Sequence, residues 1–420
     1  MDYTRKRTLI SSLNAINFVG LEGIKCGNVL QLYINNEKKS TRCMLYPAIE
    51  RMIACFFKYD YYVMGTGKIL FLFLSNNFAN PHAFDIMQKI ANLAPSKIEL
   101  HAVNKKKFNN YLYKFYLVFL WIHQMSGINL SLGEKSYLGV LLFHAYTEMK
   151  WILSKIKTKE ISLVASIHDV RMEDNLIVQY FNSINVDTVA LAHGSFRMPM
   201  DEFDYICSVS KYYMVVDSIM YADALKLGMP TSKLIKVCLP QYLGKERQSL
   251  QFEISSQNKF GVYLSHPDEK KNNMMLLQYA DELASYINAV YYVKIHPSDN
   301  MENYVWNNDP KRCICILDSQ TEEKDIQKEI KFAVVGFRSK MFLEMFYNGK
   351  VALRYVPKAE EDVYLDIQCW KFGNASELIK EYIKCSKTDY IDQAVEEIES
   401  KYLSSEYSEK SYIKFFEKYT

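Results

Sequence analysis

The sequence AVYYVKIHPS occupies residues 289–298, and DTVALAHGS occupies residues 187–195. In each segment a short apolar run ends at a histidine, which is followed by proline or glycine and then by serine. Apolar runs of this length predict buried β-strands. In open α/β sheets, ligands bind just beyond the carboxyl ends of the strands. The two segments therefore predict a sheet in each half of the chain, with His193 and His296 at ligand-binding edges.

Length and composition indicate a globular protein with more than one core. The chain has 420 residues, of which 49% are hydrophobic and 24% are charged. A single core rarely grows beyond about 250–300 residues, so two domains are expected. The formal net charge is only +3 and no arginine-rich stretch is present. These features argue against a nucleic-acid partner.

The remaining composition favours a cytoplasmic protein. The first residues are basic, but polar breaks follow them and a small-residue cleavage site is missing, so a secretory signal is not indicated. The nine cysteines lack metal-ligand spacing, and reduced thiols in a cytosolic protein are expected. No apolar stretch reaches the length of about 18–20 residues that a membrane span needs.

One aromatic segment leaves two structural alternatives open. Residues 111–125, YLYKFYLVFLWIHQM, follow a run of lysines at residues 105–107. The segment predicts either a buried element of the first domain or an interfacial helix. In the second case the protein would attach peripherally to the inner face of the cell membrane.

Apolar runs and amphipathic segments follow one another in the order of a doubly wound α/β fold. In the first half the predicted strands are residues 68–74, 97–103, 161–167, 187–192, 205–209 and 234–238, and the predicted helices are residues 81–94, 173–182 and 211–227. In the second half the predicted strands are residues 259–264, 289–293, 313–317, 332–335 and 351–355, and the predicted helices are residues 272–286 and 340–347.

These elements predict an α/β protein with two Rossmann-like domains. Residues 1–240 are assigned to an N-terminal acceptor domain and residues 256–375 to a C-terminal nucleotide-donor domain. Residues 239–258 turn polar and lose their periodicity, which is typical of a linker. Residues 376–420 are charged and helical, and they are expected to pack back across the domains.

The motifs at the strand ends resemble those of a known group of enzymes. The chain carries His-Gly at 193–194, His-Pro at 296–297 and Gly-Phe-Arg-Ser at 336–339, with Glu344 in the following helix. This order resembles bacterial surface-polysaccharide transferases of the GT-B fold, in which two Rossmann-like domains face each other across a cleft. The resemblance covers residues 161–355. It is closest to sialyltransferases and polysialyltransferases and to the CDP-glycerol glycerophosphotransferases of teichoic acid synthesis.

The resemblance implies a glycosyltransferase that builds a bacterial capsule, lipooligosaccharide or other surface polysaccharide. The enzyme would transfer a sugar, of the sialic acid kind, from a CMP-activated donor to a hydroxyl of a glycan or glycolipid, with inversion. It would use no cofactor besides the donor and no metal. Three alternatives remain: a CDP-glycerol or CDP-ribitol phosphotransferase, a UDP-sugar 2-epimerase-like enzyme, and a non-catalytic scaffold for capsule assembly.

The donor-side residues are predicted in the second domain. Proline after His296 restricts the backbone on both sides of the peptide bond and orients the imidazole, which can then donate a hydrogen bond to a phosphate. Ser339 is expected at a helix N-terminus, where anions are favoured. In the resembling families, residues at these two places contact the donor phosphate. The predicted set is completed by Pro297, Ser298, Gly336, Arg338, Glu344 and His266.

The acceptor-side residues are predicted in the first domain. His193 is the candidate general base, because an imidazole with an unperturbed pKa of about 6.5 can take the proton of an attacking hydroxyl. Gly194 would let the acceptor approach the backbone closely, and Ser195 follows it. His168 and Asp169 end a neighbouring strand and are expected to line the same crevice. An acceptor-positioning or structural role for His193 is the alternative.

Overall fold

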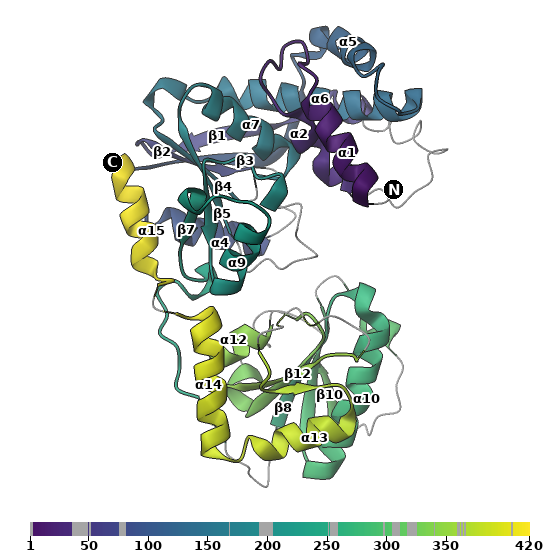
Figure 1. Ribbon diagram of the computed structural model, residues 1–420, viewed down its shortest axis with the longest axis vertical. Coiled ribbons are helices and arrows are strands. Elements are labelled where there is room, and N and C mark those ends of the chain that lie inside the picture. Colours follow the sequence, from purple (N-terminus) through teal and green to yellow (C-terminus); the bar gives the residue numbers. More distant parts are fainter. Residues whose placement is uncertain are drawn as a thin grey trace. The chain divides into compact units, whose positions relative to one another are not determined.

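The structure, a computed structural model, contains two α/β units with Rossmann-like sheets (Figure 1), which confirms the predicted fold class. The first unit consists of Met1–Gly244 and Ser404–Thr420, and the second consists of Lys245–Leu403. Residues 376–420 are thus divided between the two units. The residues that the structure describes are 3–35, 49, 52–74, 81–167, 169–192, 205–250, 252, 259–296, 299–304, 311–316, 326–339, 341–358, 362, 364, 367–404 and 406–420.

The first unit is built on a sheet with the strand order β1-β3-β2-β4-β5-β6-β7. Its strands are β1 (Phe57–Met64), β2 (Ile69–Phe73), β3 (Lys97–Phe108), β4 (Leu163–Ile167), β5 (Asp187–Leu191), β6 (Tyr212–Val215) and β7 (Leu234–Lys236). Strands β1 and β3 pair antiparallel at one edge, and the other neighbouring pairs are parallel. The chain extends the sheet from β2 to β3 and later from β4 to β7, so its topological switch point lies between β2 and β4.

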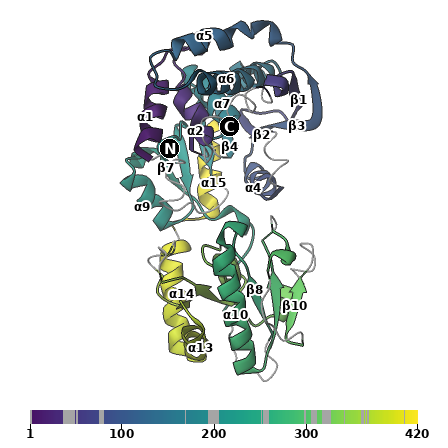
Figure 2. The same ribbon diagram turned by 90° about the vertical axis from the view of Figure 1, so that its right-hand side faces the viewer.

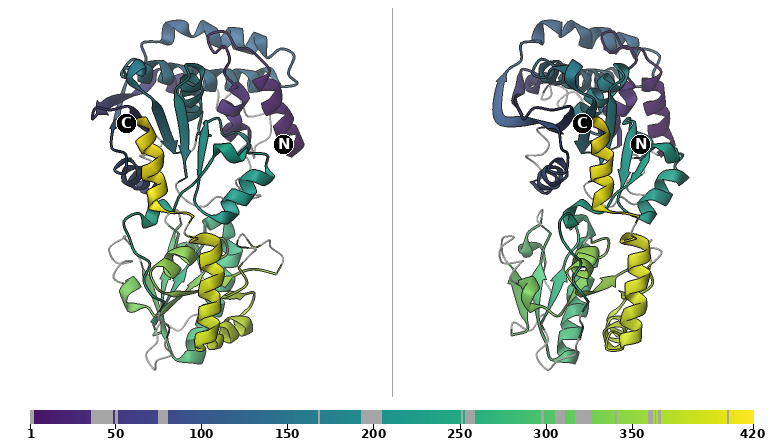
Figure 3. Two further views of the ribbon diagram at one scale, coloured as in Figure 1. Left: turned by 60° about the vertical axis from the view of Figure 1, so that its left-hand side comes forward. Right: turned by 90° about the vertical axis from the view of Figure 1, so that its left-hand side faces the viewer.

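Helices cover both faces of the first sheet. They are α1 (Tyr3–Asn14), α2 (Cys26–Asn35), α4 (Pro81–Ala91), α5 (Tyr116–Gln124), α6 (Leu132–Leu153), α7 (Met172–Ser183), α9 (Ser218–Lys226) and α15 (Glu409–Phe416). Helix α7 packs on β4 and β5 and is joined there by α2 and α6. On the other face, Phe416 of α15 meets Phe71 of β2 with ring centroids 5.6 Å apart. Figure 3 shows α15, the yellow helix that ends at the C-terminus, beside the strands of the first unit. Strands β2 and β4 are buried along their whole length, as parallel strands covered on both faces should be.

The region after β5 differs from the prediction. The sequence predicts a strand at residues 205–209 and a helix over residues 211–227, but the strand is β6 and the helix begins only at Ser218. The side chain of Asp217 accepts a hydrogen bond from the backbone N–H of Met220 at 2.8 Å and caps α9. The aromatic and β-branched residues before this cap therefore belong to the sheet.

The second unit contains a sheet with the strand order β10-β9-β8-β11-β12-β13, in which the neighbouring pairs are parallel. Its strands are β8 (Lys259–Tyr263), β9 (Val290–Lys294), β10 (Cys313–Ile316), β11 (Phe332–Val335), β12 (Val351–Tyr355) and β13 (Lys371–Phe372). The chain extends the sheet from β8 to β10, crosses back, and then extends it from β11 to β13. The topological switch point lies between β8 and β11.

The helices of the second unit are α10 (Lys270–Ile287), α12 (Met341–Tyr347), α13 (Ala375–Lys384) and α14 (Thr388–Tyr402). Helices α10 and α13 contact each other, and Tyr279 of α10 packs on Tyr355 of β12 with ring centroids 5.6 Å apart. The side chain before Tyr355, Arg354, points to the other face and lies 4.9 Å from the ring of Phe342 on α12. Within the described ranges, no helix of either unit is long and apolar enough to cross a membrane.

A buried carboxyl group in the first unit couples folding to pH. Glu148 of α6 is 2% exposed and accepts a hydrogen bond from the hydroxyl of Tyr61 at 2.5 Å. Burial raises the pKa of Glu148 to about 7, and the nearby Glu173 raises it further. The hydrogen bond from Tyr61 opposes this shift in pKa without cancelling it.

We expect Glu148→Gln to remove a pH dependence of stability. The pKa of Glu148 is about 7 in the folded protein and about 4.5 for the unperturbed group. The folded state therefore gains stability from protonation of Glu148, and this stability is fully present below about pH 4.5 and is lost as the pH rises through about 7. Between pH 4 and pH 8, the free energy of unfolding of the wild type should fall relative to that of the variant by an amount on the order of 3 kcal/mol. Urea denaturation at each pH measures the difference, and a constant difference would contradict the prediction.

Candidate functional site

Three predicted donor-side segments meet at one edge of the second sheet. Strands β9, β8 and β11 are direct neighbours and run parallel, so their carboxyl ends lie side by side. His296 follows β9, His266 follows β8 and Gly336 follows β11. The edge between β8 and β11 is the switch point of this sheet, which is where α/β sheets bind their ligands.

The two histidines at this edge lie against each other. The ring centroids of His266 and His296 are 5.1 Å apart, and the rings meet edge to face. Nδ1 of His266 accepts a hydrogen bond from the backbone N–H of Asp268 at 3.3 Å and also lies 3.3 Å from Oδ2 of that residue. Burial lowers the pKa of His296, and the neighbouring His266 lowers it further. An anion bound here would favour the charged form of His296 and would offset this cost.

Gly336 is required by the close approach of β8 and β11. A Cβ atom at this position would lie 2.5 Å from Oγ and 3.0 Å from the backbone nitrogen of Ser265. The hydroxyl of Ser265 donates a hydrogen bond to the carbonyl oxygen of Phe337, so this side chain cannot turn away without losing that bond. Any larger residue at position 336 would therefore push the two strand ends apart.

Arg338 has an unusual backbone conformation. Its φ is +64°, in the left-handed region, which costs a non-glycine residue on the order of 1–3 kcal/mol and is concentrated at ligand-binding and catalytic sites. Its guanidinium lies 4.5 Å from the centroid of the Phe337 ring. Nη1 of Arg338 is 3.3 Å from Oε1 of Glu269, three residues after His266. This contact draws the positive charge toward the end of β8.

Ser339 and Glu344 belong to the start and the middle of α12. The hydroxyl oxygen of Ser339 accepts a hydrogen bond from the backbone N–H of Met341 at 3.3 Å, so this side chain caps the helix. Glu344 is half-buried on α12. The cap and a phosphate contact are compatible, because a serine hydroxyl that accepts one hydrogen bond still has its own proton to donate.

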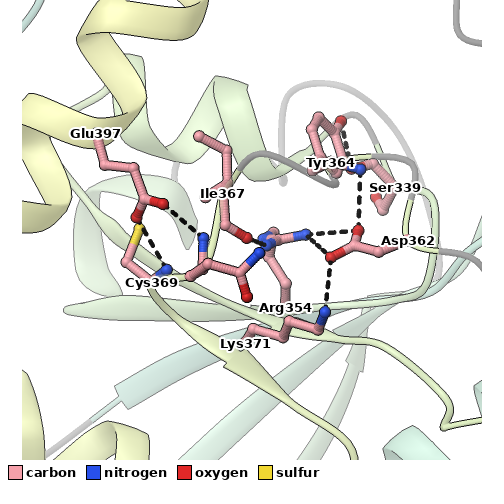
Figure 4. Close-up of polar contacts among 9 residues, drawn as sticks. Ser339, Arg354, Asp362, Tyr364, Ile367, Cys369, Lys371 and Glu397 are labelled. Carbon is pink, nitrogen blue, oxygen red and sulfur yellow. Dashed lines mark hydrogen bonds and ion pairs between the residues drawn. The ribbon is translucent and has the colours of Figure 1, made fainter.

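A buried ion pair between Arg354 and Asp362 supports the segment that contains Ser339 (Figure 4). Arg354 is 2% exposed, and its Nη1 donates to Oδ1 of Asp362 at 3.0 Å. Lys371 adds a second positive charge 3.3 Å from Oδ2 of Asp362. The same carboxylate accepts a hydrogen bond from the backbone N–H of Tyr364 at 2.9 Å, and the hydroxyl of Tyr364 donates to the carbonyl oxygen of Ser339 at 3.3 Å. Asp362 thus connects the core of the second unit to the segment that carries Arg338.

Asn273 is a supporting residue that sequence analysis did not identify. It is 1% exposed; its Oδ1 accepts from the backbone N–H of Ser265 at 2.9 Å and its Nδ2 donates to the carbonyl of Ser265 at 3.0 Å. This double contact fixes the backbone immediately before His266. A signal is present in the sequence, since Asn273 shares the buried stripe of α10 with Leu276, Leu277 and Ala280. A polar residue on such a stripe indicates a specific buried partner.

In the first unit, Asp169 holds the backbone of a loop. The side chain is fully buried, and its Oδ2 accepts hydrogen bonds from the hydroxyl of Ser208 at 2.9 Å and from the backbone N–H groups of Val209 at 2.8 Å and Ser210 at 2.6 Å. These contacts give Asp169 a structural role at the end of β4. Its role on the acceptor side stays a prediction.

Other predicted site residues lie outside the described residues, and their roles stay predictions. They are His168, His193, Gly194, Ser195, Pro297 and Ser298.

The fold is similar to that of solved nucleotide-sugar enzymes. A putative UDP-N-acetylglucosamine 2-epimerase from Listeria monocytogenes is 9% identical, over 83% of this chain and 94% of that chain, with a TM-score of 0.53. A UDP-GlcNAc 2-epimerase from Neisseria meningitidis bound to UDP-GlcNAc is 10% identical, over 84% and 98%, with a TM-score of 0.49. A lipopolysaccharide outer core galactosyltransferase is 10% identical, over 83% and 98%, with a TM-score of 0.46.

The first of these likenesses shows the fold alone, and that fold is the predicted GT-B type. No protein-family profile matches the sequence. No curated protein has a sequence that matches it. The resemblance to sialyltransferases and to CDP-glycerol glycerophosphotransferases stays a prediction.

We expect Asp362→Ala to destabilise the second unit. The change leaves the guanidinium of Arg354 buried without its carboxylate, which typically costs about 3–5 kcal/mol. Urea denaturation followed by circular dichroism measures the loss. Asp268→Ala is the matched control, because the side chain of Asp268 is 80% exposed and its removal should change stability by less than about 0.5 kcal/mol. Equal stabilities of the two variants would show that the ion pair does not hold this loop.

Proposed function

We propose that the protein is a nucleotide-sugar-dependent glycosyltransferase of the GT-B type and that its second unit binds the donor. The observation that carries the proposal is the convergence of His266, His296 and Arg338 at the switch point of the second sheet. Two imidazoles and a guanidinium can each donate a charge-assisted hydrogen bond to a phosphate. The strained backbone of Arg338 supports a ligand-binding role for this residue.

The proposed chemistry uses this cluster to stabilise the leaving group. When the bond between the anomeric carbon and the phosphate oxygen breaks, negative charge grows on the departing nucleotide. Burial lowers the pKa of His296 in the free protein, whereas a bound phosphate favours the protonated ring, so the histidine gains its charge together with the donor. Ser339, Arg338 and Glu344 would complete the contacts to the phosphate and ribose, with Gly336 allowing the close approach.

On the acceptor side, we propose that His193 takes the proton of the attacking hydroxyl in a single displacement with inversion. Gly194, Ser195 and His168 would line the acceptor subsite, which would take a glycan or glycolipid. This part of the proposal rests on the sequence.

A CMP-activated acidic sugar, of the sialic acid kind, is the proposed donor. The Gly-Phe-Arg-Ser segment at 336–339 supports this choice, because it resembles the corresponding segment of the sialyltransferase branch. The His-Gly pair at 193–194 favours instead a CDP-glycerol or CDP-ribitol donor. A UDP-sugar 2-epimerase is a further candidate, since the likeness in fold includes a structure described as such an enzyme. The donor nucleotide separates these candidates.

We expect cytidine nucleotides to raise the melting temperature of the full chain. A ligand that binds only the folded state at 100 times its Kd stabilises that state by about 2.7 kcal/mol. Thermal unfolding is followed with saturating CMP, CDP, UDP or GDP. The shift with CMP should shrink by more than half in His296→Ala and in Arg338→Ala. His123→Ala, which changes an exposed histidine of the first unit, is the matched control and should keep the full shift.

Each outcome of this screen decides one element of the proposal. A larger shift with UDP or GDP would overturn the cytidine donor, and an undiminished shift in His296→Ala would overturn the phosphate contact. Incubation of the protein with a CMP-sugar and a glycan acceptor then tests transfer. Interconversion of a UDP-sugar without any acceptor would identify an epimerase instead.

A further inference from the structure

The outer face of α5 exposes large apolar side chains. Tyr116, Phe119 and Leu120 are 57%, 67% and 40% exposed. Their spacing of three and four residues places them on one face of the helix. Tyr113 in the turn before the helix and Phe108 at the end of β3 are 72% and 61% exposed. We call these five residues the α5 surface; Figure 2 shows α5 lying across α6 in the first unit.

The α5 surface is presented by a firmly packed helix. Leu117, Val118 and Trp121 form the opposite, buried face of α5. Nε1 of Trp121 donates a hydrogen bond to the carbonyl oxygen of Val19 at 2.9 Å. Val118 packs against Gly139 of α6, where an added Cβ would lie 3.4 Å from Cγ1 of Val118. The exposed rings are therefore a fixed feature of the first unit and not the result of a frayed end.

The segment that carries the α5 surface has charges of one sign. Residues 100–133 contain four lysines and neither Asp nor Glu. Lys105 and Lys106 are exposed on β3, three and two residues before Phe108. Lys107 is paired with Asp60 at 2.5 Å, so the first two lysines supply most of the uncompensated charge on this strand.

We propose that the α5 surface docks onto an anionic phospholipid membrane. Tyrosine rings favour the headgroup layer, where their apolar ring and polar hydroxyl are both satisfied, and phenylalanine and leucine side chains enter the boundary with the acyl chains. Lysines beside them are attracted by anionic headgroups. An exposed apolar cluster next to uncompensated lysines matches such a surface better than it matches a folded protein, whose interfaces are of mixed charge and bury their aromatic residues at the centre. The inference uses the first unit alone and does not depend on the proposed donor chemistry.

The test is cosedimentation of the full chain with phosphatidylcholine vesicles, with and without 30% phosphatidylglycerol. We expect strong binding to the anionic vesicles, weak binding to the neutral ones, and loss of binding at high salt. Tyr116→Ser combined with Phe119→Ser should lower the partition coefficient more than tenfold. Lys105→Gln combined with Lys106→Gln should lower it by about fivefold per lysine. Tyr286→Ser, which changes a tyrosine that is 59% exposed on α10, is the control and should leave binding unchanged.

Three results would overturn the proposal. They are equal binding to neutral and anionic vesicles, binding that survives the double serine change, and absence of vesicle binding. If the protein does not bind vesicles but dimerises, and the double serine variant is monomeric in sedimentation equilibrium, the surface is a contact between two copies of the chain. The nucleotide-induced thermal shift should be unchanged in every variant, which separates failure of this inference from failure of the donor site. Phe119→Ser alone serves as the milder variant if the double change lowers the melting temperature.

Discussion

The pairing of β8 with β11 is the constraint on which the donor edge depends. The donor edge is the edge of the second sheet where His296, His266 and Gly336 follow their strands. These strands are far apart in the chain. After β10 the chain crosses back over the sheet, and β11 pairs with the edge of β8 that β9 leaves free. The backbone N–H of Gly336 donates to the carbonyl of Tyr263 at 2.8 Å, which extends the ladder beyond the last strand residues. The pairing brings residues of β8 and β11 together at a point where neither strand alone could form a site. Asn273 and Asp362 then fix the two backbones from behind.

The elements that were predicted correctly share a physical signature. Buried parallel strands such as β2 and β4 are continuous apolar runs, so sequence alone separates them from the amphipathic helices between them. Strand β1 carries polar and aromatic residues in alternation and is half exposed at the sheet edge, and its pairing with β3 depends on residues about 40 positions away in the chain. The boundary between β6 and α9 is decided by the cap of Asp217, which competes with the helical periodicity of the residues before it.

Only part of the donor edge was predictable from the sequence, because some of its contacts join residues that are far apart in the chain. Histidines at strand ends can be located by counting along an apolar run, and the strand order then brings them together. The contact between Arg338 and Glu269 joins residues 69 positions apart. The left-handed backbone conformation occurs at an arginine, whereas sequence reasoning expects it at glycine. The link from Asp362 to Ser339 runs through a segment without periodicity. Such contacts become evident only once the tertiary structure sets which loops are neighbours.

The return of the last residues to the first unit has a consequence for biosynthesis. Phe416 of α15 covers Phe71 in the middle of the first sheet, so this part of the sheet stays uncovered until α15, which follows the second unit in the chain, has been synthesised. The second unit is continuous in sequence and lies between the two parts of the first, so it can reach its native state earlier. The first unit, although it begins earlier in the chain, is therefore expected to finish folding after the second, and the apolar surface around Phe71 is open to aggregation until then.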